Sequence, residues 1–120
     1  MEGKIVNTNS GSYVRVMPGS DLLASERDLL DLLSYCYEAG DSKILLEGIY
    51  LDPAFFDLSS GVAGEIFHKL STYQVKTAIV ADLQAIKSER FQELIRESNK
   101  GRQINYFESV TDAEKWLVTY

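Results

Sequence analysis

The stretch Ala78-Ile79-Val80-Ala81 decides the fold class of this chain. It contains no polar side chain, which is typical of a strand that is covered on both faces of a parallel sheet. Ile44-Leu45-Leu46 has the same character, and Ile104–Phe107 predicts a further strand. Because segments with helical spacing separate these strands, we predict right-handed strand–helix crossovers and a largely parallel sheet.

Upstream of these strands, the sequence predicts a hairpin. Ile5-Val6 and Tyr13-Val14-Arg15-Val16 have the character of short strands, and the turn residues Asn9-Ser10-Gly11 separate them. We therefore expect one α/β domain over residues 1–120, with a mostly parallel sheet, an antiparallel N-terminal edge strand and four helices. The sheet should have about five strands. The helices are predicted at residues 25–39, 61–73, 88–99 and 111–120.

Two of the predicted helices have sequence features that predict which side is buried or where the helix starts. In the helix at 61–73 the apolar stripe extends to Tyr73, and Gly64 near this stripe would let the helix approach the sheet closely. Thr111-Asp112-Ala113-Glu114 has the spacing of a capping box, which predicts that the last helix starts there. The apolar stripe of that helix comprises Ala113, Trp116, Leu117 and Tyr120.

The composition is that of an ordinary globular domain. The 120 residues are 45% hydrophobic and 25% charged, with a net charge of −6. These values exclude a disordered tail, a fibre and a disulfide scaffold, and they disfavour nucleic-acid binding, which needs a basic face. No run approaches the roughly 20 apolar residues of a membrane span, and no signal-peptide pattern opens the chain. We therefore predict a cytoplasmic location.

The acidic excess lies in the first two thirds of the chain, and much of it gathers around one predicted helix. A partner that docks there is expected to be basic, unless the charges simply form a solvated face. Cys36 is the only cysteine, so an internal disulfide and a cysteine zinc site are both excluded. We expect it to be buried. The acidic residues of this helix region are Glu26, Asp28, Asp31, Glu38 and Asp41.

The stretch Asp57-Leu58-Ser59-Ser60-Gly61 places two hydroxyls before a predicted helix. Unpaired N–H groups and the helix dipole favour negative charge there, so the site suits an anion or a phosphoserine. Ser60 is the first candidate and Ser59 the second, with Asp57 nearby, and Gly61 would keep the approach open. The alternative is that one of the serines simply caps the helix.

Acidic residues also follow the predicted strands. Glu47, Asp57 and Asp82 should lie near the carboxyl edge of the sheet, where open α/β folds bind ligands. If they converged, they could hold a hard cation such as Mg²⁺, but their spacing does not require convergence. His68, the only histidine, should face solvent, which disfavours serine–histidine catalysis. We therefore predict no catalytic residue, resident metal or cofactor.

Two resemblances involve these residues. The element order, with Asp57-Leu58-Ser59-Ser60-Gly61-Val62 before the second helix, resembles the STAS domain (sulphate transporter and anti-sigma-factor antagonist). In that family, a serine or threonine just before the helix glycine can be phosphorylated by a partner kinase, and the phosphate then controls docking. The matching position here is Ser60. Leu58 departs from the pattern, because the family's acidic residue usually precedes the Ser-Ser pair directly.

More of the chain is similar to the bacterial family called domain of unknown function 4180. This resemblance spans most of residues 5–118 and implies a STAS-like α/β fold without an activity. The Ser-Ser pair is not among the fixed features of that family. The matching pieces are Glu38-Ala39-Gly40, Phe55-Phe56-Asp57-Leu58, Gly61-Val62-Ala63-Gly64-Glu65-Ile66, Val75-Lys76-Thr77-Ala78-Ile79-Val80, Asp82 and Asn99-Lys100-Gly101.

These observations favour a non-enzymatic regulatory module that binds a protein. Phosphorylation of Ser60 or Ser59 would switch it, and the partner would be a serine kinase or another regulator. Assembly of several copies is compatible with the sequence. The alternative is a small enzyme, or a binder of an anion or a metal, that uses Glu47, Asp57 and Asp82 at the carboxyl edge of the sheet.

Overall fold

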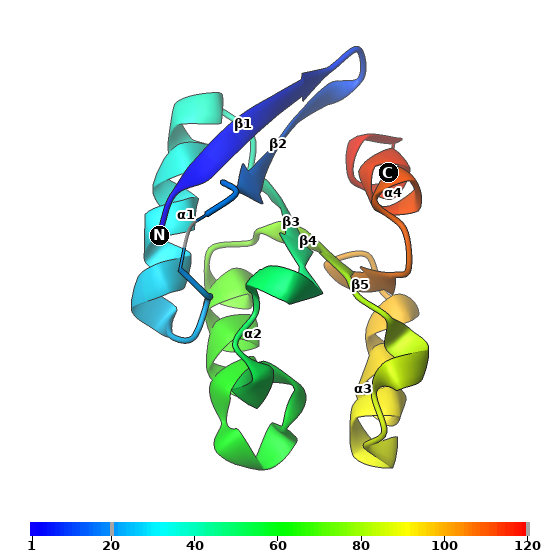
Figure 1. Cartoon of the computed structure of the whole chain (residues 1–120). Coiled ribbons are helices and arrows are strands. Elements are labelled where there is room, and N and C mark those ends of the chain that lie inside the picture. Colours follow the sequence, from blue (N-terminus) through cyan, green and yellow to red (C-terminus); the bar gives the residue numbers. More distant parts are fainter. Residues whose placement is uncertain (20, 120) are drawn as a thin grey trace.

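The computed structural model describes residues 1–19 and 21–119 and contains a five-stranded sheet with the order β1-β2-β3-β4-β5 (Figure 1). The first two strands are antiparallel, and each later pair is parallel. This topology confirms the predicted α/β domain and its antiparallel edge strand. The strands are β1 (Gly3–Thr8), β2 (Gly11–Val16), β3 (Lys43–Glu47), β4 (Lys76–Val80) and β5 (Ile104–Phe107).

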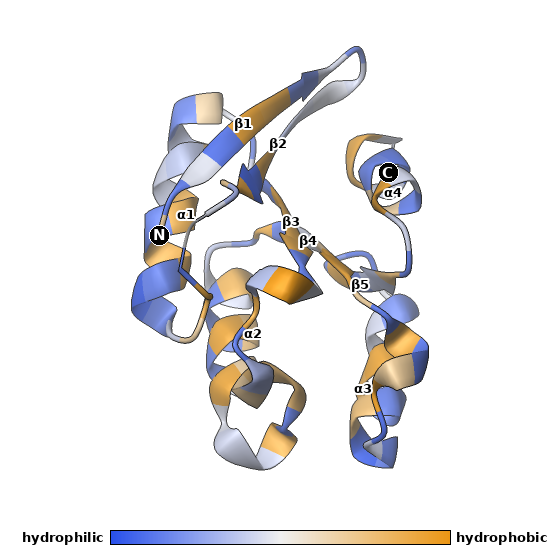
Figure 2. Cartoon of the chain, viewed as in Figure 1, coloured by the Kyte–Doolittle hydropathy of each residue, from blue (hydrophilic) through white to orange (hydrophobic). Residues whose placement is uncertain are grey.

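Four α-helices cover the two faces of the sheet unequally. Helices α1 (Glu26–Ala39), α2 (Val62–Thr72) and α3 (Glu89–Asn99) pack on one face, and α4 (Val110–Thr119) packs on the other. Along α1 and α3, hydrophilic and hydrophobic bands alternate, as expected for helices that turn one side to a sheet (Figure 2). The larger core therefore lies between the sheet and α1–α3.

Short 3-10 helices form the connections at the carboxyl edge of the sheet. Three of them lie between β3 and α2: η1 (Gly48–Tyr50), η2 (Pro53–Phe56) and η3 (Leu58–Ser60). The fourth, η4 (Leu83–Ala85), follows β4. Asp52 caps the start of η2, because its carboxylate accepts a hydrogen bond from the N–H of Ala54 at 2.9 Å.

The predicted ends of α1 and α3 are confirmed by their caps. Ser25 accepts a hydrogen bond from the N–H of Asp28, and Ser88 accepts one from the N–H of Phe91. Gly40 ends α1 in the left-handed conformation, with φ 73°. These caps depend on local sequence alone, which is why the sequence predicts them well.

Two expectations about α2 are wrong. Tyr73 lies beyond the helix end and its side chain is 52% exposed, so it is not part of the buried stripe. Gly64 is exposed, and a Cβ built there meets no atom within 4 Å, so it does not bring α2 close to the sheet. Both residues sit at the margin of the stripe, where a small rotation of the helix decides which side is buried.

The start of α4 also differs from the prediction. The helix begins at Val110, and the hydroxyl of Ser109 accepts a hydrogen bond from the N–H of Asp112 at 3.1 Å. Ser109 therefore takes the capping role expected of Thr111. Glu114, the other end of the expected capping box, accepts a hydrogen bond from the hydroxyl of Tyr13 instead. Tyr120, expected on the apolar stripe, lies outside the described residues.

Across residues 1–19 and 21–119, no helix has both the length and the hydropathy that crossing a bilayer requires.

Candidate functional site

A cleft of about 700 Å³ opens at the carboxyl edge of the sheet. It lies beyond the ends of β3, β4 and β5, between η1 and η2 on one side and η4 on the other. This is the edge at which open α/β sheets bind their ligands. Its apolar lining consists of Ile49, Pro53, Phe56, Val80, Ala81, Ala85 and Ile86.

Two structural features set the shape of this cleft. A Cβ on Gly48 would lie 3.1 Å from the Cβ of Ala81, so only glycine lets η1 pack this closely against the end of β4. The ring of Phe56 contacts those of Phe55 and Phe91, with centroid distances of 5.1 and 5.5 Å. The wall formed by η2 is therefore anchored in the core.

Charged residues line the same cleft. Glu47 is the last residue of β3, Asp82 comes shortly after β4, and Glu108 directly follows β5. Among the described residues, Lys87 is the one basic side chain of the lining. Neither Asp82 nor Glu108 forms an ion pair within the described part of the chain. The cleft thus combines an apolar lining with a net negative charge.

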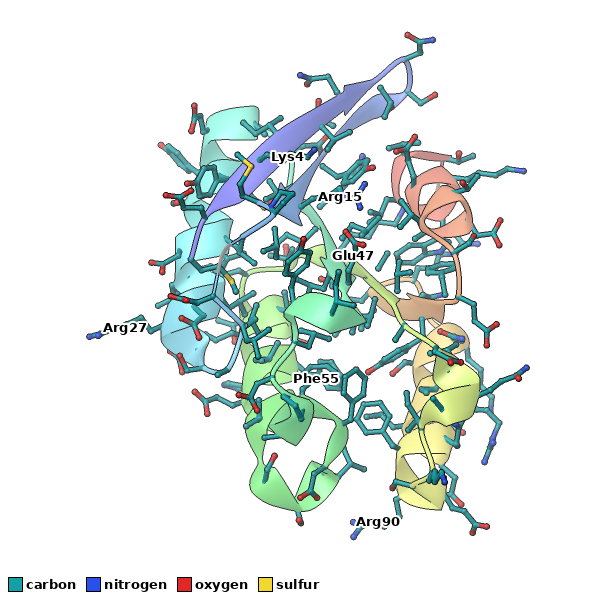
Figure 3. The ribbon with its side chains drawn as sticks, viewed as in Figure 1. Lys4, Arg15, Arg27, Glu47, Phe55 and Arg90 are labelled. Carbon is teal, nitrogen blue, oxygen red and sulfur yellow. The ribbon has the colours of Figure 1, made fainter. Side chains whose placement is uncertain are left out.

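Glu47 is held by an ion pair with Arg15 of β2. The two side chains lie next to one another beside the strands (Figure 3), and each is about a quarter exposed, at 23% for Glu47 and 24% for Arg15. Partial burial is the largest single effect and lowers the pKa of Arg15, but the hydrogen bond to Glu47, the charge of Glu47 and the contact with Tyr13 together exceed it, so the pKa of Arg15 is raised. The carboxylate of Glu47 is thus oriented and neutralised before any ligand arrives.

Of the three carboxylates expected at this edge, the structure brings only two to the cleft. Glu47 and Asp82 line it, whereas Asp57 does not. Asp57 starts η3, where its carboxylate accepts hydrogen bonds from the N–H of Ser59 at 3.1 Å and from its hydroxyl at 2.6 Å. Among the described residues, no group of three or more His, Cys, Asp or Glu side chains is placed to hold a metal ion.

The two candidate serines are exposed and hydrogen-bonded within the chain. Ser59 donates to Asp57. The hydroxyl of Ser60 is within hydrogen-bonding distance of the carbonyl oxygens of Ala54 and Asp57, and it accepts a hydrogen bond from the N–H of Val62 at 3.2 Å. Ser60 therefore links η2 and η3 to the first residue of α2.

Gly61 begins α2 in the left-handed conformation, with φ 79°. No atom lies within 4 Å of a Cβ built there. A side chain at position 61 would therefore meet open space among the described residues.

Cys36 and His68 lie where the sequence places them. Cys36 is 5% exposed, and burial raises the pKa of its thiol to about 11. His68 is exposed on α2. Neither residue lines the cleft.

Sequence reasoning missed Ile49, Phe56, Lys87 and Glu108 as residues of the cleft. Glu108 directly follows β5, so the rule that selected Glu47 and Asp82 could have found it. No local signal marks Ile49, whose side chain is 73% exposed because the short η1 helix turns it outward from the sheet.

One comparison with known proteins gives a match. The model of a family described as a domain of unknown function, DUF4180, matches residues 8–117. The match extends from the end of β1 into α4 and includes every residue of the cleft. No curated protein and no solved structure matches the chain.

Proposed function

The chain belongs to the DUF4180 family, a domain of unknown function, so we propose its function from the site itself: it is a non-enzymatic regulatory module that binds a protein partner in the carboxyl-edge cleft. One observation carries this proposal. Ile49 stands 73% exposed beside a cleft whose lining is mainly apolar. An exposed apolar residue of this size, next to an apolar groove with a polar rim, is typical of a binding surface.

The charges of the cleft define the chemistry of the partner. Asp82 and Glu108 outnumber Lys87, and Glu47 is already paired with Arg15. The partner segment should therefore carry an apolar side chain that fills the cleft and a Lys or Arg beside it that meets the carboxylates. Complementary charge of this kind raises the association rate and selects among partners.

Ser60 is the proposed switch. A serine kinase would transfer the γ-phosphoryl group of ATP to its oxygen, ADP would leave, and the hydroxyl proton would be lost to solvent. The hydrogen bonds that this hydroxyl donates to Ala54 and Asp57 would then disappear. The phosphate would be repelled by those carbonyls and attracted by the free N–H groups at the start of α2.

This switch acts on the cleft because Ala54 belongs to η2. The same short helix supplies Pro53 and Phe56 to the lining. Loss of the bond between Ser60 and Ala54 would loosen this wall and change the affinity for the partner. The regulatory role draws on the resemblance to STAS domains, and we propose that the protein acts in the bacterial cytoplasm, where kinases and ATP are present.

A small ligand is the second candidate occupant. The observation in its favour is that Glu47 and Asp82 line one cleft together with Glu108. A small cationic molecule could be held between such carboxylates without any protein partner.

The test compares tagged wild-type protein with Ile49→Lys and Tyr73→Lys, each expressed in the host. Tyr73 is the matched control, because it is also a large hydrophobic side chain exposed to solvent. It follows the carboxyl end of α2 and does not line the cleft. We expect one partner protein to be recovered with the wild type and Tyr73→Lys, and at least tenfold less with Ile49→Lys. Equal recovery with all three proteins would exclude the cleft as the docking site.

Two further measurements on the native protein separate the remaining alternatives. Intact mass and site mapping should find phosphate on Ser60 in at least one growth state, and its absence in all states would remove the switch but not the cleft. Native mass spectrometry that finds a stoichiometric small molecule, displaced in Asp82→Asn, would favour the second candidate instead.

A further inference from the structure

Within residues 1–19 and 21–119, strand β1 has one side without a partner strand. It lies at the edge of the sheet, next to β2 alone, and its start lies beside α1 (Figure 1). The N–H of Met17 donates to the carbonyl of Glu2 at 2.9 Å, so Glu2 and Met17 form a hydrogen-bonded pair. Such pairs alternate along an antiparallel ladder. Lys4, Val6 and Thr8 therefore direct their backbone groups to β2, and the residues between them direct theirs to the open side.

The backbone groups available on the open side are those of Ile5 and Asn7. Gly3 also faces this way, but it is buried, and a Cβ there would lie 3.1 Å from Leu32 of α1. Asn7 is exposed and Ile5 partly so. Together they present two N–H donors and two carbonyl acceptors, which is the pattern that an added strand requires.

This open side runs beside an acidic flank. The amino group of Met1 donates to the carboxylate of Asp31 on α1 at 2.9 Å. That bond, with the negative charges of Asp31, Asp28 and Asp21, raises the pKa of the Met1 amine. Arg27, also on α1, points away from the strands (Figure 3). An extended segment placed beside the start of β1 would meet this negative field on the α1 side.

We propose that the open side of β1 binds an extended peptide by strand addition, with Lys or Arg at alternate positions facing α1. The backbone of Ile5 and Asn7 supplies the hydrogen bonds, and the flank of Asp28 and Asp31 selects the charge. This surface is formed by other residues than the cleft, so it does not depend on the function proposed above.

A second copy of the chain fits this edge less well. Two β1 strands paired antiparallel about a two-fold axis would place both α1 helices on the same face of a continuous sheet. Each α1 helix carries four carboxylates, Glu26, Asp28, Asp31 and Glu38, against one arginine, so like-charge repulsion opposes bringing the two helices onto one face. A basic peptide meets the same flank with the opposite charge.

The test uses an eight-residue peptide of alternating Lys and Val with blocked ends, added to the whole ¹⁵N-labelled protein. We expect the amides of Ile5 and Asn7 to exchange with solvent at least tenfold more slowly at saturation. A Glu-Val peptide of the same length should bind at least tenfold more weakly. A Lys-Val peptide of the same length in which every backbone nitrogen is methylated keeps the charge but has no N–H group to donate, so it should give no protection of these amides.

Matched variants locate the contact. Asp31→Asn should weaken binding of the Lys-Val peptide several-fold, whereas Asp112→Asn on α4 and Ile49→Lys in the cleft should leave it unchanged. Protection by the N-methylated peptide, or none by the Lys-Val peptide, would overturn the proposal. Protection of Ile5 and Asn7 without peptide, together with a dimer in size-exclusion chromatography, would assign the edge to a second copy.

Discussion

The hydroxyl of Ser60 donates to the carbonyl oxygen of Ala54, six residues earlier in the chain. This contact closes the loop that holds η2 and η3 together in front of α2. The hydroxyl oxygen of Ser60 also accepts a hydrogen bond from the N–H of Val62, so this one side chain fixes both the loop and the first residue of α2. Ser60 is thus both an exposed residue and a structural connection.

Ser60→Ala should destabilise the protein by about 1 kcal/mol, the usual loss for a hydrogen-bonded side chain that is not fully buried. Ser59→Ala should cost less, because Asp57 still accepts the N–H of residue 59 when the hydroxyl is removed. Urea unfolding of both variants measures the difference. Equal stability of the two variants would mean that the Ser60 contact contributes nothing beyond its neighbour.

The same Ser60→Ala variant should disturb the cleft wall. We expect amide chemical shifts to change at Phe56 and its neighbours in η2, because the variant lacks the bond to Ala54. The corresponding shifts in Ser59→Ala should stay near those of the wild type. Changes restricted to residues 60–63 would show that η2 holds its position without this bond.

Periodicity and local capping predicted the architecture because both depend on residues close together in the chain. The apolar run at Ala78–Ala81 requires cover on both faces, and Ser25 and Ser88 bond to N–H groups only three residues away. Gly64 and Tyr73 were misplaced because their exposure depends on how α2 rotates against the sheet, which no local pattern specifies.

The site could be predicted only in part, for the same physical reason. Strand ends identified Glu47 and Asp82, since the carboxyl ends of parallel strands meet at one edge. The ion pair between Arg15 and Glu47 joins residues 32 positions apart, and neighbouring sequence does not encode it. Asp57 belongs to the connection at this edge but does not line the cleft, because its carboxylate is used locally in the turn before Ser59.

The contribution of Cys36 to the free energy of unfolding should fall at alkaline pH. Burial raises its pKa from 9.0 to about 11, so between these values the unfolded chain releases the thiol proton while the folded chain retains it. Proton release favours unfolding, and stability should fall as pH rises from about 9 to 11.

The variant Cys36→Ala removes this titration. The stability advantage of the wild type over Cys36→Ala should therefore shrink across that range, as measured by urea unfolding at pH 8 and pH 10.5. A constant difference would contradict the raised pKa.

Two glycines should respond oppositely to alanine. Gly64→Ala should stabilise the protein by about 0.5–1 kcal/mol, because the position is helical and open, and alanine favours the helix. Gly48→Ala should destabilise it, because the new Cβ would approach that of Ala81 to 3.1 Å. Thermal unfolding compares the two variants. A stabilised Gly48→Ala protein would mean that η1 moves away from β4 without cost.

Two buried tyrosines form the last contrast. Tyr106 is 3% exposed, and its hydroxyl has no hydrogen-bond partner among the described residues. Tyr13 is fully buried, and its hydroxyl donates to Glu114 on α4 at 2.5 Å. A buried hydroxyl without a partner destabilises the folded protein, whereas a hydrogen-bonded one stabilises it.

Tyr106→Phe should therefore leave the free energy of unfolding unchanged or raise it by about 1 kcal/mol, and Tyr13→Phe should lower it by about 1–2 kcal/mol. Chemical unfolding of both variants at neutral pH decides the matter. A loss of stability in Tyr106→Phe as large as that in Tyr13→Phe would show that the Tyr106 hydroxyl has a partner in solution, such as a buried water.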